Sequence, residues 1–503
     1  MTELDRLIFR RQYLFGPTPG EYPNWEVRNM PDGYFLTVHP DLEMTAYHGQ
    51  RFNFVLLGYL LDPLNPTHTN LDVLNTFDSS AMNISSLLDL LYDKSGHYIL
   101  FIQGEEGQIV LNDAGGLKQV FYYRDNEGKT WLSSHSALIA NSLELPISEE
   151  ADHYIHSEKY KKKLEPWWPA DCSPYKGVHH LQPNHYLDLK TLKPVRFWPT
   201  RKLRHYSLKE GTRIMGDLLK GTCEAGHNRF PGALTLTGGY DTRVILAACR
   251  EFINDMDVFS MLYRKLTEDH VDIVIAKTIA KELDLKYKVI DCNQPCPADF
   301  IDVFNRSTQG YKTDWINIVY GRYAGVPSDR VVFKGNIAEA GRCDFWPDGI
   351  YPVDVNVGTL VDASSLGSDP FIRNCMREWM KGALHTEKLG YKLLDTFAWE
   401  VESGGWQAMS HSIFGMAHEE FSPFGNRKIL DVMLGVPSRY RSWPDIRLEQ
   451  EIVKYLWPAL AEFPYYSSWS LHGHKLKFYD GALLNFLRKV RFKLKRQKHD
   501  RLD

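Results

Sequence analysis

The sequence predicts two domains, an antiparallel α+β domain followed by an α/β domain built on a parallel sheet. The chain has 503 residues, 43% of them hydrophobic, which is enough for more than one buried core. Short apolar runs separated by Gly, Asn and Asp dominate about the first 145 residues. From about residue 207, strand-like and helix-like segments alternate, which is typical of a parallel sheet.

Five apolar runs in the first part of the chain are predicted to be strands, because Val, Ile, Leu, Phe and Tyr dominate them and turn residues bound them. They are RFNFVLLGYLLD, HYILFIQ, QIVLND, QVFYYRD and TWLSS. The stretch from Leu71 to Tyr92 carries apolar residues at helical spacing. We therefore expect an α+β domain with antiparallel strand pairing.

Residues 152–200 are interpreted as a connecting region that closes a first domain of residues 1–200. The region contains a basic run, a Pro- and Trp-rich patch and a hairpin-like stretch: EKYKKKLE, PWWPADCSPYKG and NHYLDLKTLKPVRFW. Four lysines without an aromatic or Gly-rich context are more typical of a solvated face than of a nucleic-acid site. We expect no nucleic-acid partner.

The second domain is predicted to span residues 207–480. Its helix-like segments are SLKEGTRIMGDLLKGTCEA, DTRVILAACREF and EDHVDIVIAKTIAKELDL, and its strand-like segments are ALTL, DVFSMLYR and YKVID. After residue 370 the pattern is mainly helical to about 460. Residues 481–503 form a basic amphipathic tail, which predicts either a docked terminal helix or a surface for membrane, RNA or a polyanionic glycan.

Charge and cysteine usage narrow the class of protein. The net charge of −4 favours no particular partner, and the sequence predicts neither a signal peptide nor a membrane span. Seven cysteines are scattered along the chain, and Cys292 and Cys296 are the only close pair. With no second pair or histidine cluster nearby, a zinc site is not indicated. We interpret the cysteines as ordinary reduced thiols and expect a cytoplasmic protein.

The turn TGGYDT, residues 237–242, carries more polar chemistry than a strand–helix junction needs. Gly238 and Gly239 let backbone amides approach a ligand, and the start of the next helix favours an anion. Thr237 and Thr242 offer hydroxyl donors to phosphate oxygens, and Asp241 suits Mg²⁺. A purely structural turn with a capped helix is the alternative.

TGGYDT resembles the SGGxDS pyrophosphate loop of the N-type ATP pyrophosphatases, with Thr in place of both Ser. Other segments resemble the asparagine synthetase-like family in the same order. They are LLGYLLDPLNPTHTN, GHYILFIQ, LNDAGGLKQVFYY and LSSHSALIA, then SPYKGVHHLQPNHYLDL, VVFKGNIAEAGR and FSPFGNRKILDVMLGVPSRYR. The resemblance implies an Ntn-hydrolase-like sandwich domain followed by a PP-loop synthetase domain.

The resemblance also implies roles for individual residues. The pyrophosphate of ATP and its Mg²⁺ would be held by Thr237, Gly238, Gly239, Asp241 and Thr242. Glu339, in the second glycine-and-acid loop, would bind Mg²⁺ or position the attacking amine. The backbone of Ser260 and Met261 would contact adenine, and Lys475 or Lys477 would neutralise pyrophosphate charge. For Glu339 the alternative is a surface side chain, and for Ser260 and Met261 a plain core strand.

The family's glutamine-hydrolysing members need an N-terminal cysteine, whereas this chain begins Met1-Thr2-Glu3. We expect that glutaminase activity is lost. The implied reaction is the adenylation of a carboxylate carried by a small molecule, peptide or glycan, followed by transfer to ammonia or an amine. Two alternatives are a sulfurtransferase or tRNA-modifying ATP pyrophosphatase that uses Cys292 and Cys296, and a non-catalytic scaffold.

HSIFGMAHEE contains His411, His418, Glu419 and Glu420 but no HExxH metal motif. We interpret these four residues as part of a helix face.

Overall fold

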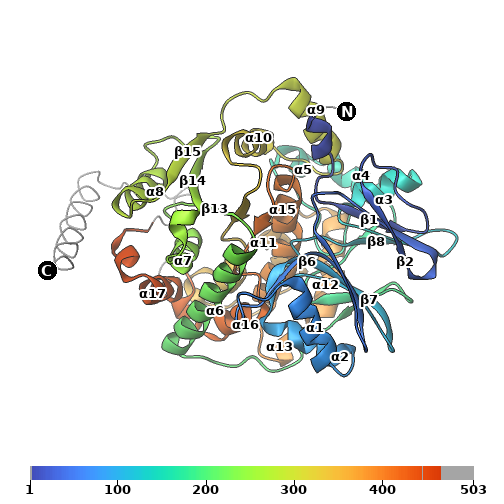
Figure 1. Ribbon diagram of the computed structural model, residues 1–503, viewed down its shortest axis with the longest axis horizontal. Helices are drawn as coiled ribbons and strands as arrows, with labels where there is room; N and C mark the ends of the chain where they lie inside the picture. Colours follow the sequence, from blue (N-terminus) through green and yellow to red (C-terminus); the bar gives the residue numbers. More distant parts are fainter. Residues whose placement is uncertain (1–2, 444–445, 466–503) are drawn as a thin grey trace.

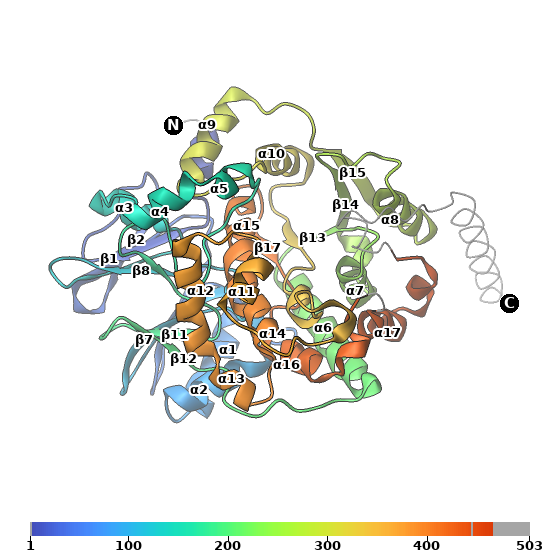
Figure 2. The same ribbon diagram turned by 180° about the vertical axis from the view of Figure 1, so that it is seen from behind.

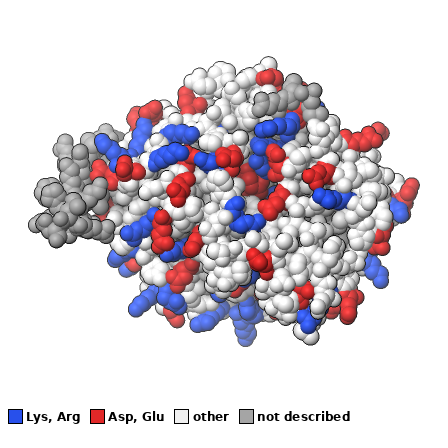
Figure 3. All heavy atoms as spheres, in the orientation of Figure 1, with Lys and Arg blue, Asp and Glu red and all other residues white. Residues whose placement is uncertain are grey.

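The computed structural model describes residues 3–443 and 446–465. Two antiparallel sheets form the N-terminal part, and a parallel sheet with helices around it forms most of the rest (Figure 1). Lys and Arg are interspersed with Asp and Glu on the face seen in Figure 3. No helix in the described part is both long and apolar enough to cross a membrane.

The first antiparallel sheet has the strand order β10-β8-β9-β1-β3-β2. Its strands are β1 (Tyr13–Gly16), β2 (Glu26–Met30), β3 (Tyr34–Val38), β8 (Phe121–Arg124), β9 (Thr130–Ser133) and β10 (His179–His180). The second sheet has the order β12-β11-β7-β6-β5-β4. Its strands are β4 (Met44–His48), β5 (Asn53–Leu61), β6 (Ser95–Gly104), β7 (Gly107–Asn112), β11 (His185–Asp188) and β12 (Lys193–Arg196).

The two sheets face each other across a buried apolar layer that includes Phe15, Phe101 and Leu132. Helices α1 (Asn70–Ser80) and α2 (Ile84–Leu90) cover the outer face of the second sheet. Helix α3 (Ser136–Leu143) covers the outer face of the first. The predicted α+β domain is therefore a four-layer sandwich of helix, sheet, sheet and helix.

Two features of this domain differ from the sequence prediction. The single helical stretch expected from Leu71 to Tyr92 is two helices, because Asn83 caps the start of α2 by accepting a hydrogen bond from the Ser86 amide. The connecting region is part of the sandwich, because β10 joins the first sheet and β11 and β12 join the second. Its basic run forms the short helix α5 (Glu158–Lys162), which follows α4 (Glu149–Ile155).

The parallel sheet has the order β15-β14-β13-β16-β17. Its strands are β13 (Gly232–Thr235), β14 (Asp257–Leu262), β15 (Tyr287–Asp291), β16 (Val331–Phe333) and β17 (Glu420–Phe421). All their pairings are parallel. The predicted alternation of strands and helices is confirmed, and β15 coincides with the predicted strand YKVID.

The helices of this part follow the predicted pattern. Helix α6 (Leu208–Arg229) precedes the sheet. The helices between β13 and β16 are α7 (Asp241–Ala248), α8 (Val271–Glu282), α9 (Ala298–Ser307) and α10 (Ile316–Gly325). Ser207 and Glu210 form a capping box at the start of α6. Later come α11 (Val357–Ser364), α12 (Pro370–Ala383), α13 (His385–Lys388), α14 (Leu393–Phe397), a π-helical segment (Ala398–Gln407), α15 (Ala408–Phe414), α16 (Arg427–Gly435) and α17 (Arg447–Leu456). Helix α11 lies beside α12 (Figure 2).

The strand order creates one topological switch point. The first strand of the sheet, β13, has β14 on one side and β16 on the other. The segments that follow β13 and β16 therefore start side by side at the same edge of the sheet. In open α/β sheets, ligands bind at this kind of crevice.

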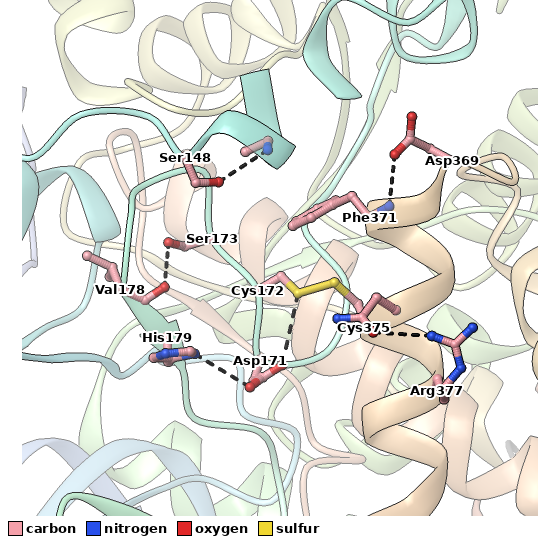
Figure 4. The surroundings of a disulfide bond; sticks show 12 residues. Ser148, Asp171, Cys172, Ser173, Val178, His179, Asp369, Phe371, Cys375 and Arg377 are labelled. Atoms are coloured by element: carbon pink, nitrogen blue, oxygen red, sulfur yellow. Dashed lines mark hydrogen bonds and ion pairs between the residues drawn. A yellow bond between two sulfur atoms is a disulfide. The ribbon is translucent and has the colours of Figure 1, made fainter. Parts of the chain in front are cut away.

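A disulfide joins Cys172 to Cys375 on α12, so the expectation of reduced thiols is wrong for these two residues (Figure 4). Their Cα atoms are 6.8 Å apart although the two cysteines are separated by 203 residues in sequence. The fold brings them together because the segment before β10 packs against α12, which no local spacing indicates. The other five cysteines are free. Structural disulfides are rare in a reducing cytosol, so the bridge gives the cytoplasmic expectation no support.

Candidate functional site

A cavity of about 800 Å³ opens at the switch point. Its walls come from the turn after β13, the segment after β16, residues 163–167, residues 363–365 and the π-helical segment. The polar side chains that line it include Lys163, Glu165, Thr237, Asp241, Asp272, Glu339, Arg342, Asp344 and Glu402. Trp167, Trp406 and Trp443 add aromatic faces.

The turn after β13 is held together by its own hydroxyl groups. The Oγ1 atoms of Thr237 and Thr242 are 2.9 Å apart and hydrogen-bonded. The Thr237 amide donates to Thr242 Oγ1 at 3.2 Å, and the Gly239 amide donates to Thr237 Oγ1 at 3.2 Å. Thr in place of Ser thus keeps the hydroxyl contacts that the turn needs.

One backbone amide of the turn donates a hydrogen bond to a carboxylate oxygen. The Gly238 amide donates to Asp272 Oδ1 at 2.5 Å, while the Gly238 carbonyl accepts from the Arg243 guanidinium at 3.2 Å. Arg243 is buried and also donates to the Phe463 carbonyl at 2.8 Å. Arg243 therefore fixes the peptide orientation that points this N–H at a negative charge, which is the arrangement that a phosphate oxygen uses.

Asp241 lies at the start of α7 and pairs with Arg342. Arg342 Nη1 is 2.8 Å from Asp241 Oδ1, and the same guanidinium reaches Glu339 at 3.3 Å and Glu449 at 3.8 Å. Burial raises the pKa of Asp241 to about 7; Arg342 opposes this shift, and the carboxylates of Glu339 and Asp344 add to it. Burial also raises the pKa of Glu449 well above its usual value. The site holds more negative charge than Arg342 neutralises.

The segment after β16 packs directly against Asp241. A Cβ on Gly335 would lie 2.3 Å from the Asp241 Cβ, so only glycine fits there. Two residues on, Ile337 adopts φ +74°, a conformation that β-branched residues rarely take. Gln407 holds this strained turn: its Oε1 accepts from the Ile337 amide at 2.7 Å, and its Nε2 donates to Glu339 at 3.1 Å.

The donors at this site fit a magnesium ion bound together with a polyphosphate. Among residues 3–443 and 446–465, no three His, Cys, Asp or Glu side chains are grouped to hold a metal ion alone. Asp241 and Glu339 both line the cavity with carboxylate oxygens, the ligands that Mg²⁺ prefers. Mg²⁺ commonly takes only one or two carboxylates and completes its shell with substrate phosphates and water.

Four of the predicted site residues line the cavity, namely Thr237, Gly239, Asp241 and Glu339. Gly238 and Thr242 shape the turn next to it. Ser260 and Met261 do not line the cavity, and the Ser260 hydroxyl contacts its neighbours in the sheet, donating to the Leu236 carbonyl. Adenine contacts of their backbone stay a prediction. Lys475, Lys477 and the basic tail 481–503 lie outside the described residues.

Several residues that build the site were not predicted from the sequence. They are Asp272, Arg342, Glu402, Gln407 and Glu449. Only Arg342 had a local signal, because it lies three residues after Glu339 at a spacing that lets the two side chains meet. The others come from α8, the π-helical segment and α17.

Of the four residues in HSIFGMAHEE, only His411 lies on a helix, so the interpretation of all four as one helix face is wrong. Helix α15 ends at Phe414, and Glu420 lies in β17 with its side chain buried. Glu420 pairs with the guanidinium of Arg322 and with Lys334 at 3.1 Å. Burial raises the pKa of Glu420, but the cations Lys334 and Arg322 outweigh burial and lower it to about 2.

Glu419 links the parallel-sheet part to the sandwich. Its carboxylate lies 2.7 Å from His97 Nδ1 on β6, 3.3 Å from Lys118 Nζ and 3.4 Å from Arg11 Nε. Ile337 reaches the same part of the sandwich, since a Cβ on Gly115 would lie 2.3 Å from the Ile337 Cδ1. The sandwich thus contacts the turn that carries Glu339.

Cys292 and Cys296 lie away from the cavity lining. Burial raises the pKa of Cys292 to about 12, and Cys296 Sγ lies 3.0 Å from Asn317 Oδ1. A reactive cysteine needs a lowered pKa, which supplies thiolate at neutral pH. Neither thiol has the environment of a catalytic cysteine.

Comparison with protein-family models and with curated proteins found no match. Solved structures gave several likenesses. The allosteric regulatory enzyme of purine biosynthesis has 11% identity and a TM-score of 0.24, over 46% of this chain and 56% of that chain. The NH3-dependent NAD synthetase from Campylobacter jejuni has 18% identity and a TM-score of 0.20, over 38% of this chain and 87% of that chain.

The glutamine phosphoribosylpyrophosphate amidotransferase from B. subtilis, solved with ADP and GMP, has 11% identity and a TM-score of 0.24, over 67% of this chain and 72% of that chain. The chain spans little more than half of the first of these three structures. The chain itself has a mixed α/β fold, in which a parallel sheet with a polar cavity at its switch point follows an antiparallel sandwich.

Proposed function

We propose that the protein is an AMP-forming carbon–nitrogen ligase, an asparagine synthetase-like enzyme that adenylates a carboxylate and then joins it to ammonia or an amine. One observation carries the proposal. The turn Thr237–Asp241 and the acid Glu339 come from the two loops that flank the switch point, and both face one cavity of about 800 Å³. Amides aimed at anionic oxygens, beside carboxylates suited to Mg²⁺, are the chemistry that ATP cleavage at the α-phosphate requires.

The chain's own residues position the first step. When ATP binds, the amides of Gly238 and Gly239 exchange their present acceptors, Asp272 Oδ1 and Thr237 Oγ1, for oxygens of the β- and γ-phosphates. Arg243 orients the turn through the Gly238 carbonyl. A carboxylate oxygen of the second substrate attacks the α-phosphorus, and the bond from that phosphorus to the bridging oxygen breaks, so pyrophosphate leaves. Mg²⁺, when bound at Asp241 and Glu339, supplies positive charge to the phosphate oxygens.

In the second step an amine nitrogen attacks the acyl carbon of the adenylate. The new C–N bond replaces the C–O bond to AMP, AMP leaves, and the nitrogen loses a proton. The nucleophile is ammonia or an amine, and the acid is a small molecule, peptide or glycan carboxylate.

The test is ATP–pyrophosphate exchange over a library of carboxylic acids, because exchange requires the acid but no amine. We expect exchange and AMP formation with the wild-type chain, and a loss of about a hundredfold or more in Asp241→Asn. Asp302→Asn, an exposed carboxylate on α9, is the matched control and keeps wild-type activity. Release of ADP in place of AMP, or full exchange activity in Asp241→Asn, would overturn the proposal.

The two alternatives make different predictions. A sulfurtransferase would need Cys292 or Cys296, and neither thiol lines the cavity. If the protein is a ligase, alkylation of both cysteines should leave the ATP–pyrophosphate exchange activity intact, whereas a sulfurtransferase should lose its activity. A non-catalytic scaffold would bind no ATP at millimolar Mg²⁺, which calorimetry measures directly.

A further inference from the structure

Glu402 is a carboxylate of the cavity that the proposed nucleotide chemistry does not use. It lies in the π-helical segment Ala398–Gln407, on the same element as Trp406 and Gln407. Short π-helical segments are frequent at functional sites. In this protein the segment also supports Glu339 through Gln407, so Glu402 has a defined position relative to the loops of the proposed active site.

The polar neighbours of Glu402 are committed to other partners. Lys163 Nζ donates to the carbonyl of Ser365 at 3.3 Å, and Arg342 binds Asp241 and Glu339. Glu165 pairs with Arg264 and accepts from Trp406 Nε1 at 3.0 Å. By contrast, Glu402 Oε2 is buried and has no hydrogen-bond partner among the residues that the structure describes.

An orphaned buried carboxylate is costly unless a ligand neutralises it. Burial raises the pKa of Glu402 well above its usual value, and the carboxylates of Asp344 and Glu339 add to this shift. Six acidic side chains line the cavity against two basic ones. Such an excess of acidic side chains attracts a cation.

The aromatic side chains narrow the class of cation. Trp167 and Trp406 line the same cavity, and a Cβ on Gly405 would lie 2.6 Å from the Trp167 ring, so the π-helical segment packs tightly on that ring. Indole faces bind ammonium groups and also the carbon atoms attached to them.

We propose that Glu402, Trp167 and Trp406, here called the amine wall, bind the nitrogen donor as the ammonium form of an organic primary amine. Glu402 contacts the ammonium group, and the indole rings contact its carbon chain. The ammonium group gives one proton to water before its nitrogen, now a neutral amine, attacks the adenylate. The amine wall rests on the proposed function for its role, and it deepens that function by selecting an organic amine over free ammonia. Glu402 is the residue that makes the wall prefer a cationic amine to a neutral molecule of the same shape.

Calorimetry on the full chain tests this binding with three probes: n-butylammonium, ammonium and 1-butanol. We expect the wild-type chain to bind n-butylammonium more tightly than ammonium, and 1-butanol most weakly. Glu402→Gln should weaken n-butylammonium binding about ten- to a hundredfold, because a charge-assisted contact is lost. Glu387→Gln, an exposed acid on α13, is the matched control and should bind like wild type.

Trp406→Phe provides a second variant that keeps an aromatic face but loses the indole contact. It should weaken n-butylammonium binding while leaving ammonium binding unchanged. Equal affinity of Glu402→Gln and wild type for n-butylammonium would overturn the amine wall. So would a Glu402→Gln variant whose only defect is weaker Mn²⁺ binding, measured by electron paramagnetic resonance, because Glu402 would then be a ligand of the divalent cation.

The calorimetry is run with and without the non-cleavable nucleotide α,β-methylene-ATP. This separates the two proposals. Failure of the wild-type chain to bind the nucleotide would overturn the proposed function, even where n-butylammonium binds. Normal nucleotide binding together with equal binding of n-butylammonium and 1-butanol would overturn the amine wall alone.

Discussion

Arg342 holds both carboxylate oxygens of Asp241, with Nη1 at 2.8 Å from Oδ1 and Nη2 at 3.2 Å from Oδ2. Glu339 and Glu449 approach the same guanidinium at 3.3 Å and 3.8 Å. One buried cation therefore sits among three carboxyl groups, two of which are the proposed magnesium ligands. Arg342 compensates charge that a divalent cation would otherwise have to neutralise.

Replacing Arg342 by Gln should destabilise the chain by about 3 kcal/mol, because the carboxyl groups around it lose their counter-charge. Millimolar MgCl2 should recover part of this loss, and should recover more than it adds to the wild-type chain. Urea unfolding with and without MgCl2 measures both effects. Arg213→Gln, on an exposed part of α6, is the control and should change stability little. If MgCl2 leaves the unfolding free energy of Arg342→Gln unchanged, Arg342 does not compensate the charge of a cation site.

Gly335→Ala should disturb the site by forcing the two loops apart. The new Cβ would lie 2.3 Å from the Asp241 Cβ, so we expect a loss of about 1–3 kcal/mol in unfolding free energy and weaker nucleotide binding. Gly382→Ala on α12 is the matched control. Among the residues that the structure describes, none has an atom within 4 Å of a Cβ at position 382, and alanine in a helix should stabilise the chain by up to about 1 kcal/mol. Similar effects of the two substitutions would contradict the close approach at Gly335.

The buried pair of Glu420 and Arg322 should make the chain sensitive to acid. The pKa of Glu420 falls from 4.5 to about 2, so its contribution to stability is present above about pH 4.5 and is lost as the pH falls through about 2. Glu420→Gln should cost about 3–5 kcal/mol at neutral pH, since it leaves Arg322 buried without its counter-charge. Urea unfolding at neutral and acid pH should show the difference from wild type shrinking toward low pH. If the difference in unfolding free energy between Glu420→Gln and wild type stays constant with pH, the ionised pair of Glu420 and Arg322 is refuted.

Reduction of the Cys172–Cys375 disulfide should lower stability by about 2–4 kcal/mol, because the bridge closes a long loop. Thermal unfolding with and without dithiothreitol measures this in the wild-type chain. The Cys172→Ser/Cys375→Ser double variant should already have the lower stability and should not respond to the reductant. Cys296→Ser, which removes a free thiol, should respond like wild type. An unchanged unfolding temperature of the wild type in dithiothreitol would exclude the bridge.

Much of the fold could be predicted because local patterns decide it. The capping box at Ser207 and the run YKVID each specify an element without help from distant residues. The turn at 237–242 was predictable for the same reason, since its glycines, threonines and Asp241 are contiguous. Glu339 could be placed only through resemblance, and the structure puts its side chain on the same cavity.

The rest depends on contacts that sequence spacing does not encode. Glu402 and Glu449 lie more than 150 residues from the turn. Only the packing of the π-helical segment and α17 brings Glu449 near Asp241 and Glu402 near Glu339. Glu420 follows a helix in sequence and resembles part of its polar face, but a strand register places it beside Val332 in the sheet. In sequence, β11 and β12 resemble a hairpin in a linker. Only the pairing of β11 with β7 shows that they belong to the sandwich.

The contacts that Glu419 and Ile337 make with the sandwich have a consequence for how this chain can be divided. Cutting it near residue 200 would leave Glu419 without His97 and Lys118, and would uncover the Ile337 side chain beside Gly115. The strained turn that carries Glu339 would lose one of its supports. The N-terminal sandwich therefore stabilises the part of the chain that carries the site. The two parts cannot be exchanged or expressed separately unless the contacts of Glu419 and Ile337 with the sandwich are replaced.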